Sequence, residues 1–392
     1  MQNTVHSIID NDLYKFTMQQ AVCQLYPRAW ARYEFINRGK TQFPSGFAEA
    51  LKWELMALQN LQLQEIEKNF LLNHCYYLTP FYVDFLAGYR FDPRNEVRII
   101  QEDGNLKVIV EGPWYRTILW EVPLMSMISE LYFKKSDVPT HSREHLDEQD
   151  RAKATRLAKL LVKYADFGTR RRHSFRNHDR IVKINKEYAP DAFVGTSNVY
   201  LAMINTLKPI GTHAHEWFMF HAAKYGFHEA NKLALQRWAD VYQGELGIAL
   251  SDTFTTSDFL NSFGTYFAKL FDGVRHDSGD PIKFAQKILN YYEYIHIDPM
   301  TKTIVFSDGL NVDKVAEIEK FCKGKIKTSY GIGTYLTNDV GPKALNMVIK
   351  MTACKPKGRD YPWVPTCKLS DVEGKHTGDP ETIAICKKVL GI

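Results

Sequence analysis

Hydrophobic and polar positions follow a mixed pattern in the first third of the chain. Apolar residues recur at helical spacing after the acidic cluster 10–12, which predicts a capped helix through about residue 26. Strict alternation over 31–36 predicts a strand. Two alternating runs within 97–110 flank Asp-Gly and predict a hairpin, and Pro113 is expected to open a long apolar helix through about Phe133.

A different pattern begins near residue 164, where short apolar or β-branched runs each end in small, polar or charged residues before a helical stretch. Seven such units occur, at 164–170, 192–198, 209–212, 247–252, 273–279, 304–309 and 328–334. Alternating strands and helices predict a parallel sheet, and seven units favour a closed barrel over an open doubly wound sheet. We therefore expect the α/β class: an irregular, TIM-like α/β barrel with an N-terminal α+β domain.

Three units are expected from this pattern: an N-terminal α+β domain (1–139), a barrel (140–345) and a C-terminal segment (346–392) that packs back on the first. Barrel enzymes carry their chemistry where strands end, and the Arg, His, Asp, Ser and Gly residues of this chain concentrate there.

Composition narrows the class further. The 392 residues carry 50 Lys and Arg against 45 Asp and Glu, a net charge of +5 that does not suggest a nucleic-acid-binding protein. No apolar, uncharged run of about 18 residues and no secretory signal are found, so we expect no membrane partner. The six cysteines lack C-x-x-C spacing, which favours reduced thiols in the cytoplasm.

Basic charge is nonetheless local, because residues 151–186 contain twelve Lys or Arg and two acids. Thr169 is followed directly by Arg170, Arg171 and Arg172, three guanidiniums after one strand. Guanidiniums bind phosphate or carboxylate through paired hydrogen bonds, so we expect one or two of them to bind an anion. A solvated helix start or a salt-bridge set is the alternative.

Two glycine-containing strand ends predict a phosphate site. Gly331, Gly333 and Thr334 can present backbone N–H groups, and Ser307, Asp308 and Gly309 end another strand. Two such loops on neighbouring barrel strands form the usual phosphate corner of this fold. A sugar-phosphate ligand is therefore expected.

The segment 275–281 is dense in charge at a third strand end. Arg275 is expected to meet an anionic group and Asp277 to hold Mg²⁺-bound diphosphate or ribose hydroxyls. Asp280 before Pro281 is better explained as the start of the next helix.

The segment 211–217, with His221 beyond it, has three interpretations. His213 and His215 match a metal-ligand pair, although further ligands are missing at the other strand ends. A structural helix start is the second. The third is a nucleophilic histidine, held by Glu216, that accepts a phosphoryl group. Residue chemistry alone does not choose among them.

Six motifs in this order resemble nicotinate phosphoribosyltransferase, the ATP-assisted family of NAD salvage. They are Asp12-Leu13-Tyr14-Lys15-Phe16-Thr17-Met18, the segment from Phe167 to Ser174, Gly195-Thr196-Ser197-Asn198, Gly211-Thr212-His213-Ala214-His215-Glu216-Trp217, the segment from Arg275 to Pro281, and Ser329-Tyr330-Gly331-Ile332-Gly333-Thr334. The resemblance spans the chain from about residue 11 to the C-terminal region.

This resemblance implies a ligase-type, ATP-coupled reaction. Nicotinate, 5-phosphoribosyl 1-diphosphate, ATP and water give nicotinate mononucleotide, diphosphate, ADP and phosphate, with Mg²⁺ accompanying the phosphate substrates. It implies that His215 is transiently phosphorylated, with Glu216, Arg275 and Asp277 as further catalytic residues. No protein metal ligand is assigned.

For the nicotinate subsite, the resemblance implies that Phe167 and Tyr14 sandwich the pyridine ring, with Tyr14 supplied by the second subunit of a homodimer. Arg275 is carried over as the carboxylate partner, assisted by Arg170. Nicotinamide-using relatives carry an Asp where this chain has Ser197, and a serine there favours the acid substrate.

Rival classes remain at this stage: a metal-dependent barrel hydrolase using His213 and His215, and a basic nucleic-acid-binding protein using 151–186. Within the favoured class, nicotinamide phosphoribosyltransferase is the nearest alternative. Quinolinate phosphoribosyltransferase is further away because it does not need the phosphorylatable histidine.

Overall fold

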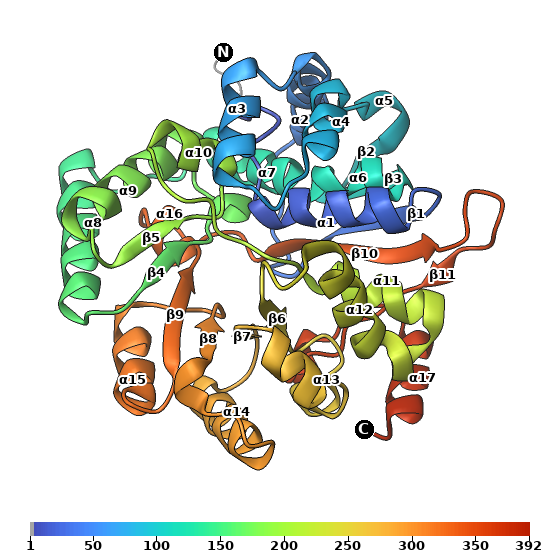
Figure 1. Cartoon of the computed structure of the whole chain (residues 1–392). Helices are drawn as coiled ribbons and strands as arrows, with labels where there is room; N and C mark the ends of the chain where they lie inside the picture. Colours follow the sequence, from blue (N-terminus) through green and yellow to red (C-terminus); the bar gives the residue numbers. More distant parts are fainter. Residues whose placement is uncertain (1–3) are drawn as a thin grey trace.

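Two β-sheets organise the chain in the computed structural model, which describes residues 4–392 (Figure 1). The first third contains α1 (Leu13–Leu25), β1 (Trp30–Asn37), α2 (Phe47–Ala57), η1 (Leu58–Asn60), α3 (Glu65–His74), α4 (Pro80–Gly88), α5 (Pro93–Glu96), β2 (Val97–Glu102), β3 (Asn105–Pro113), α6 (Trp114–Thr117), η2 (Ile118–Trp120) and α7 (Glu121–Lys135).

The remaining elements alternate helix and strand before a final β-hairpin and helix. They are α8 (Arg143–Lys159), β4 (Tyr164–Asp166), η3 (Thr169–Arg171), α9 (Phe175–Tyr188), β5 (Phe193–Thr196), α10 (Val199–Ile204), α11 (His215–Tyr225), α12 (Phe227–Tyr242), β6 (Ile248–Leu250), α13 (Thr256–Leu270), β7 (Gly273–His276), α14 (Pro281–Tyr294), η4 (Pro299–Thr301), β8 (Thr303–Phe306), α15 (Val312–Cys322), β9 (Lys327–Ile332), α16 (Thr334–Thr337), β10 (Met347–Lys355), β11 (Val364–Pro365), η5 (Glu373–Lys375) and α17 (Pro380–Leu390).

The antiparallel sheet has the order β11-β10-β1-β3-β2. It confirms the strand expected at 31–36 and the hairpin expected within 97–110. Asp103 and Gly104 have φ angles of 46° and 76°, the positive values that a two-residue hairpin turn of this hand requires. Alternate residues of β1 are buried, which follows the polar–apolar alternation in the sequence.

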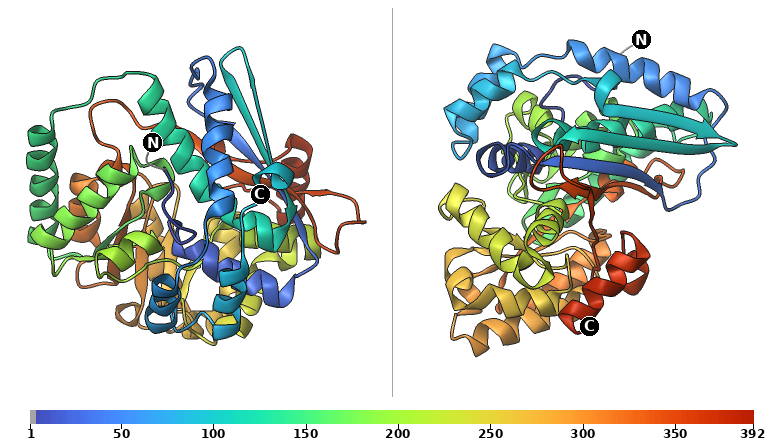
Figure 2. Two further views of the ribbon diagram at one scale, coloured as in Figure 1. Left: turned by 90° about the horizontal axis from the view of Figure 1, so that it is seen from above. Right: turned by 90° about the vertical axis from the view of Figure 1, so that its right-hand side faces the viewer.

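β10 joins this sheet from the other end of the chain. It pairs antiparallel with β1 along its length, from Trp30 opposite Lys355 to Asn37 opposite Met347. The right-hand panel of Figure 2 shows this sheet above the helices and strands of the second half. The division of the chain at residues 139 and 345 stays a prediction.

The structure refines two local expectations. Pro113 ends β3 opposite Trp30 and also caps α6, so the expected helical stretch follows it, divided into α6, η2 and α7. The helix α1 forms as expected, but the side chain of Asp12 makes no cap hydrogen bond. Both acids flanking this start serve tertiary contacts, because Ser197 donates to Asp12 and Arg172 pairs with Asp10.

The second sheet is parallel and confirms six of the seven expected strand units, in the order β5-β4-β9-β8-β7-β6. The seventh, at 209–212, is a single bridge from Pro209 to Thr196 of β5. Thr212 then donates its hydroxyl to the carbonyl of Ile248 in β6, at 3.2 Å. Residues 209–212 thus connect the two edge strands, β5 and β6, without forming a strand of their own. The mixed α/β class is confirmed, but in the part of the chain that the structure describes no continuous ladder of strand hydrogen bonds joins β5 to β6.

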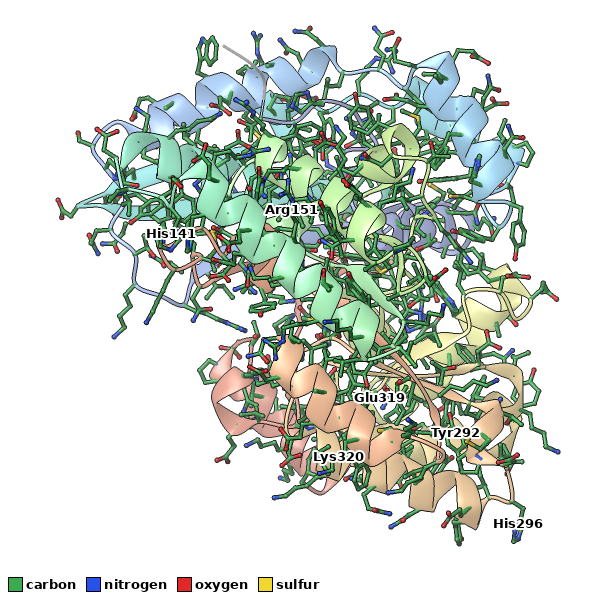
Figure 3. The ribbon with its side chains drawn as sticks, turned by 90° about the vertical axis from the view of Figure 1, so that its left-hand side faces the viewer. His141, Arg151, Tyr292, His296, Glu319 and Lys320 are labelled. Carbon is green, nitrogen blue, oxygen red and sulfur yellow. The ribbon has the colours of Figure 1, made fainter. Side chains whose placement is uncertain are left out.

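Helices cover the outside of the parallel sheet. Figure 3 shows α8, marked by Arg151, above α15, marked by Glu319 and Lys320, on one outer face. The two helices are linked there by Arg156 and Asp313. Among residues 4–392, none of the helices combines the length and the apolar character that a membrane crossing requires.

Much of the basic charge in 151–186 is paired inside the chain. Arg172 and Asp10 are both fully buried, with two guanidinium nitrogens 2.8 and 3.0 Å from the two carboxylate oxygens. Arg180 instead bridges two carboxylates, with one guanidinium nitrogen 2.8 Å from Asp147 and the other 2.6 Å from Asp150. These pairs tie the polar surfaces of neighbouring elements together and leave a weaker positive field for nucleic acid than the sequence suggests.

Replacing Arg172 with Ala should destabilise the fold by about 3–5 kcal/mol, because Asp10 would remain buried without its cation. Denaturation by urea measures this change. The matched control is Arg156→Ala, which breaks a pair of exposed side chains and should cost less than about 1 kcal/mol. Equal effects of the two substitutions would contradict the structural role of the Arg172–Asp10 pair.

Candidate active site

One cavity of about 780 Å³ lies where the carboxyl ends of the parallel strands face the antiparallel sheet. Its wall includes residues from the ends of β4, β7, β8 and β9, together with Asn346 and residues 347–351 of β10. The cationic lining residues are Arg38, Arg170, Arg171, Arg275, Lys343, Lys350, Lys368 and Lys375, and the acidic ones are Asp12, Glu121, Glu216, Asp277, Asp308 and Asp339. The site therefore suits an anionic ligand.

Most of the candidate residues lie together in this cavity. They are Tyr14, Phe167, Arg170, Ser197, His215, Glu216, Arg275, Asp277, Ser307, Asp308, Gly309, Gly333 and Thr334. Thr169 and Gly331, both expected at the phosphate, do not line it. The clustering follows from the fold, because parallel strands bring their carboxyl ends to one edge.

Gly331 serves the aromatic wall instead. A Cβ placed on Gly331 would lie 2.3 Å from the ring of Phe167, so the ring occupies the space that a side chain would fill. Phe167 and Tyr14 of the same chain both line the cavity. The expectation that a second subunit supplies this tyrosine stays a prediction, and its alternative is that one chain supplies both rings, because both reach this cavity.

The three consecutive arginines separate. Arg170 and Arg171 line the cavity, whereas Arg172 is held by Asp10 in the interior. One guanidinium nitrogen of Arg170 is 3.3 Å from a carboxylate oxygen of Glu121. Burial, reinforced by neighbouring Arg170, lowers the pKa of Arg171 to about 10. An anion placed between these two arginines would relieve that repulsion.

Ser197 lies beside an acid that the sequence did not indicate. Its hydroxyl donates to Asp12 at 2.7 Å, and both residues line the cavity. Burial raises the pKa of Asp12, although Arg170 and Ser197 counteract that shift. Ser197 is itself uncharged, but the carboxyl group of Asp12 lies next to it in the cavity.

His215 is the first residue of α11 and is held by a carboxylate. Its Nε2 lies 2.9 Å from Asp252 and 3.6 Å from Asp277. Burial lowers the pKa of His215 to about 4, and nearby Lys368 adds to the shift. The ring is therefore neutral near pH 7, and a proton on Nε2 toward Asp252 leaves the lone pair on Nδ1.

Asp252, at the end of the β6 unit, replaces Glu216 as the partner of His215. It also binds Lys368 at 3.1 Å and accepts the hydroxyl of Ser278 at 2.6 Å. Glu216 instead accepts a hydrogen bond from Tyr33 and pairs with Lys15. The expectation that Glu216 holds the histidine was wrong, because this side chain points from the first turn of α11 toward α1 and β1.

The other two histidines of this segment are structural. His213 Nε2 accepts a hydrogen bond from the backbone N–H of Leu250 at 3.1 Å, and burial lowers its pKa well below the usual value. His221 hydrogen-bonds Tyr26 and the carbonyl of Trp217. His213 and His215 therefore do not converge as metal ligands, and the geometry does not support the hydrolase alternative.

Arg275 and the two acidic strand ends also line the cavity. Arg275 places its guanidinium 3.8 Å from Asp277 and 3.3 Å from the carbonyl of His213. Ser307 donates to Asp277 at 2.9 Å, and Asp308 pairs with Lys375 at 2.7 Å. As expected, Asp280 caps α14.

A divalent cation has a limited choice of ligands here. Within residues 4–392, His215, Asp252 and Asp277 form one cluster whose ligand atoms lie within 4.8 Å of one another. Asp252 is already committed to Lys368, Ser278 and His215, while Asp277 faces the cavity. Oxygen-preferring Mg²⁺ therefore fits best as an ion that arrives with a phosphate ligand and meets Asp277.

Sequence reasoning missed Asp252 and the cations of the C-terminal segment. Asp252 follows a strand unit, the same signal that found Asp277. Lys350 carries no such signal, because it reaches the cavity through the pairing of β10 with β1. Lys368 and Lys375 lie in the segment after β11 and are held there by Asp252 and Asp308. Burial lowers the pKa of Lys350 to about 8.

The chain is similar to known proteins over nearly its full length. Residues 9–129 match the model of the nicotinate phosphoribosyltransferase (NAPRTase) N-terminal domain, and residues 162–392 match that of the nicotinate phosphoribosyltransferase (NAPRTase) family. It is 53% identical to the nicotinate phosphoribosyltransferase of Chromohalobacter salexigens, covering 98% of each chain.

Two further relatives extend this similarity. The nicotinate phosphoribosyltransferase of Desulforapulum autotrophicum is also 53% identical, covering 98% of this chain and 99% of the relative. A crystal structure of nicotinate phosphoribosyltransferase from Porphyromonas gingivalis superposes with a TM-score of 0.96 at 44% identity, covering 99% of this chain and 100% of the other.

The environment of His215 predicts a specific dependence of stability on pH. Its pKa is about 4 when folded, against about 6.5 when unfolded, so between these values only the unfolded chain holds the proton. Stability should therefore fall as the pH drops through this range, by up to about 3 kcal/mol from this ring. Urea denaturation from pH 4 to 7 should show a flatter curve for His215→Gln. Parallel curves for the two proteins would contradict the burial effect.

Proposed function

This chain belongs to the nicotinate phosphoribosyltransferase family, and on that premise we propose that it transfers the phosphoribosyl group of 5-phosphoribosyl 1-diphosphate to nicotinate. The products are nicotinate mononucleotide and diphosphate, and hydrolysis of ATP to ADP and phosphate is coupled to the transfer. The observation that carries the proposal is the cation-lined cavity in which the two aromatic rings and His215 meet.

The pyridine subsite is formed by Tyr14 and Phe167. Two flat rings accept an aromatic ligand between them without demanding hydrogen bonds from its faces. Arg275 is the proposed partner of the nicotinate carboxylate, assisted by Arg170, and both guanidiniums line the cavity. The Ser197 hydroxyl already serves Asp12, so it places no extra negative charge against the acid substrate.

The phosphate groups are proposed to lie along the strand ends and the C-terminal cations. The loops 307–309 and 333–334 present polar groups, and Lys350, Lys368 and Lys375 supply positive charge. Asp277 would hold the Mg²⁺ that accompanies the substrates, and this ion supplies neutralisation of phosphate charge when bound. These cations stabilise a leaving group that carries several negative charges.

The transfer itself requires positioning more than proton chemistry. Departure of diphosphate from the ribose C1′ leaves oxocarbenium character, and the aromatic slot presents the pyridine nitrogen in line with that carbon. Arg275 fixes the orientation of the pyridine ring by binding the nicotinate carboxylate.

ATP contributes through His215. The neutral ring offers the lone pair of Nδ1 to the γ-phosphorus while Asp252 holds the proton of Nε2. The phosphorylated ring carries about two negative charges, which the N-terminus of α11 and Lys368 can stabilise. Hydrolysis of the phosphohistidine then releases phosphate and restores the neutral His215 ring.

We also propose a homodimer in the cytoplasm as the working form. The six cysteines are free thiols, five of them buried, as suits a reducing compartment. We propose that each chain uses its own Tyr14 together with Phe167, because both side chains line one cavity.

The assay mixes the protein with labelled nicotinate, 5-phosphoribosyl 1-diphosphate and Mg²⁺, with and without ATP. Nicotinate mononucleotide should form, faster with ATP, and nicotinamide should be a poor substrate. In His215→Ala, nicotinate-stimulated hydrolysis of ATP should fall to background while a slower, ATP-independent transfer survives. The matched control is His221→Ala, whose ring lies outside the cavity. Full ATP coupling in His215→Ala would remove this residue from the role, and absence of the mononucleotide would refute the proposed reaction.

Co-expression of two inactive chains tests whether the aromatic pair is shared. One chain carries Tyr14→Ala and the other Phe167→Ala. If the two rings of a site come from one chain, as proposed, the mixture should remain as inactive as its parents. A site shared between subunits would instead restore roughly a quarter of the intact sites in randomly mixed dimers. Recovered activity on that scale would place Tyr14 in the partner's site.

A further inference from the structure

Lys15 is a fully buried lysine in a cage of four side chains. Its ammonium lies 2.6 Å from a carboxylate oxygen of Glu121 and pairs with Glu216. It also lies 5.3 Å from the ring centre of Tyr14 and 5.7 Å from that of Tyr33. Such a cage costs much free energy to assemble without its cation, because two carboxylates are buried against each other.

The cage joins two parts of the proposed site. Glu121, at the start of α7, also contacts Arg170 at 3.3 Å and accepts the Tyr14 hydroxyl at 3.4 Å. Both of these residues belong to the pyridine subsite. On its other side, Lys15 holds Glu216, which directly follows His215 in the first turn of α11.

The carboxylate of Glu216 is also held by the N-terminal sheet. Tyr33 donates its hydroxyl to Glu216 and accepts a hydrogen bond from the indole N–H of Trp114 at 2.8 Å. Trp114 and Tyr33 are both buried in the N-terminal sheet region. The position of Glu216, and with it the start of α11, is therefore fixed by Lys15 on one side and by Tyr33 on the other.

The chain of contacts carries alternating charge. Burial alone would lower the pKa of Lys15, but Glu121 and Glu216 raise it above its usual value, so the ammonium stays charged. The pKa of Glu121 is lowered to about 2, against the effect of its burial, by Lys15 and Arg170. Arg170, Glu121, Lys15 and Glu216 thus form a series of cation, anion, cation and anion, which is buried except for Arg170 at the cavity end.

We propose that Lys15 is a positioning residue that couples occupancy of the pyridine subsite to phosphorylation of His215, through the ion series Arg170–Glu121–Lys15–Glu216. The proposal rests on the function proposed above and assigns a route for its coupling. Nothing in it requires Lys15 to touch a substrate.

The physical basis is competition for a shared charge. A ligand carboxylate or phosphate at Arg170 draws this guanidinium away from Glu121, which then interacts more strongly with Lys15. The ammonium is held less tightly by Glu216 in consequence, and the first turn of α11, with the His215 ring, responds. By linkage, phosphorylation of His215 changes the affinity for nicotinate by the same factor.

The test measures nicotinate-stimulated phosphorylation of His215 from γ-labelled ATP, and the number of ATP molecules consumed per mononucleotide formed. In Lys15→Met the stimulation by nicotinate should fall about 5–150-fold, the usual range of coupling between sites, and ATP should be hydrolysed in excess over product. A general structural defect lowers both reactions together and leaves the ratio unchanged. A folded Lys15→Met protein with the wild-type ratio overturns the proposal.

Two further variants keep the test decisive. Lys302→Met is the matched control, because Lys302 is also buried but bonds the carbonyl of Phe271, away from the cavity, and its ratio should equal that of the wild type. The pair Lys15→Met/Glu216→Gln removes one charge of each sign and stands in if the single variant does not fold. A pair that retains wild-type coupling refutes the relay, whereas a wild-type protein that makes no mononucleotide refutes the underlying function instead.

Discussion

The antiparallel pairing of β1 with β10 is the interaction on which both the fold and the site depend. It places a strand from the end of the chain in the N-terminal sheet, between β1 and β11. The same strand presents residues 347–351 to the cavity, and the chain that follows it brings Lys368 and Lys375 to the strand ends. Without this pairing, the carboxyl ends of the parallel strands would keep their acids and lose part of the positive charge that balances them.

Most charged side chains around the cavity are paired with a side chain of opposite charge. Asp252 is shared by His215, Lys368 and Ser278, and Glu121 is shared by Lys15 and Arg170. Buried ion pairs of this kind add little net stability, but they fix the positions of the groups that take part. A site prepared for several phosphate groups needs such fixed cations, because movable ones would have to be reorganised during the reaction.

Local patterns in the sequence were sufficient for the first helix, the first strand, the hairpin and six parallel strands, and for the residues that strand ends deliver. Asp277 and Ser307 were found because each follows an apolar run, and parallel strands bring such positions to one edge, whereas Phe167 was assigned through the family resemblance. Glu216 was assigned to His215 because the two are adjacent in sequence, yet neighbours at a helix start point in different directions. Lys350 and Arg38 could not be found, since their approach depends on long-range pairing and no local pattern records it.

The position of β10 also has a consequence for how the protein is made. β1 is complete soon after synthesis begins, but its partner at residues 347–355 leaves the ribosome only near the end of translation. During that interval one edge of β1 lacks its hydrogen-bonding neighbour, and an unpaired edge invites pairing with other chains. The newly made polypeptide therefore needs protection along β1 until its last segment emerges, and loss of that segment would leave the N-terminal sheet unfinished as well as the cavity unlined.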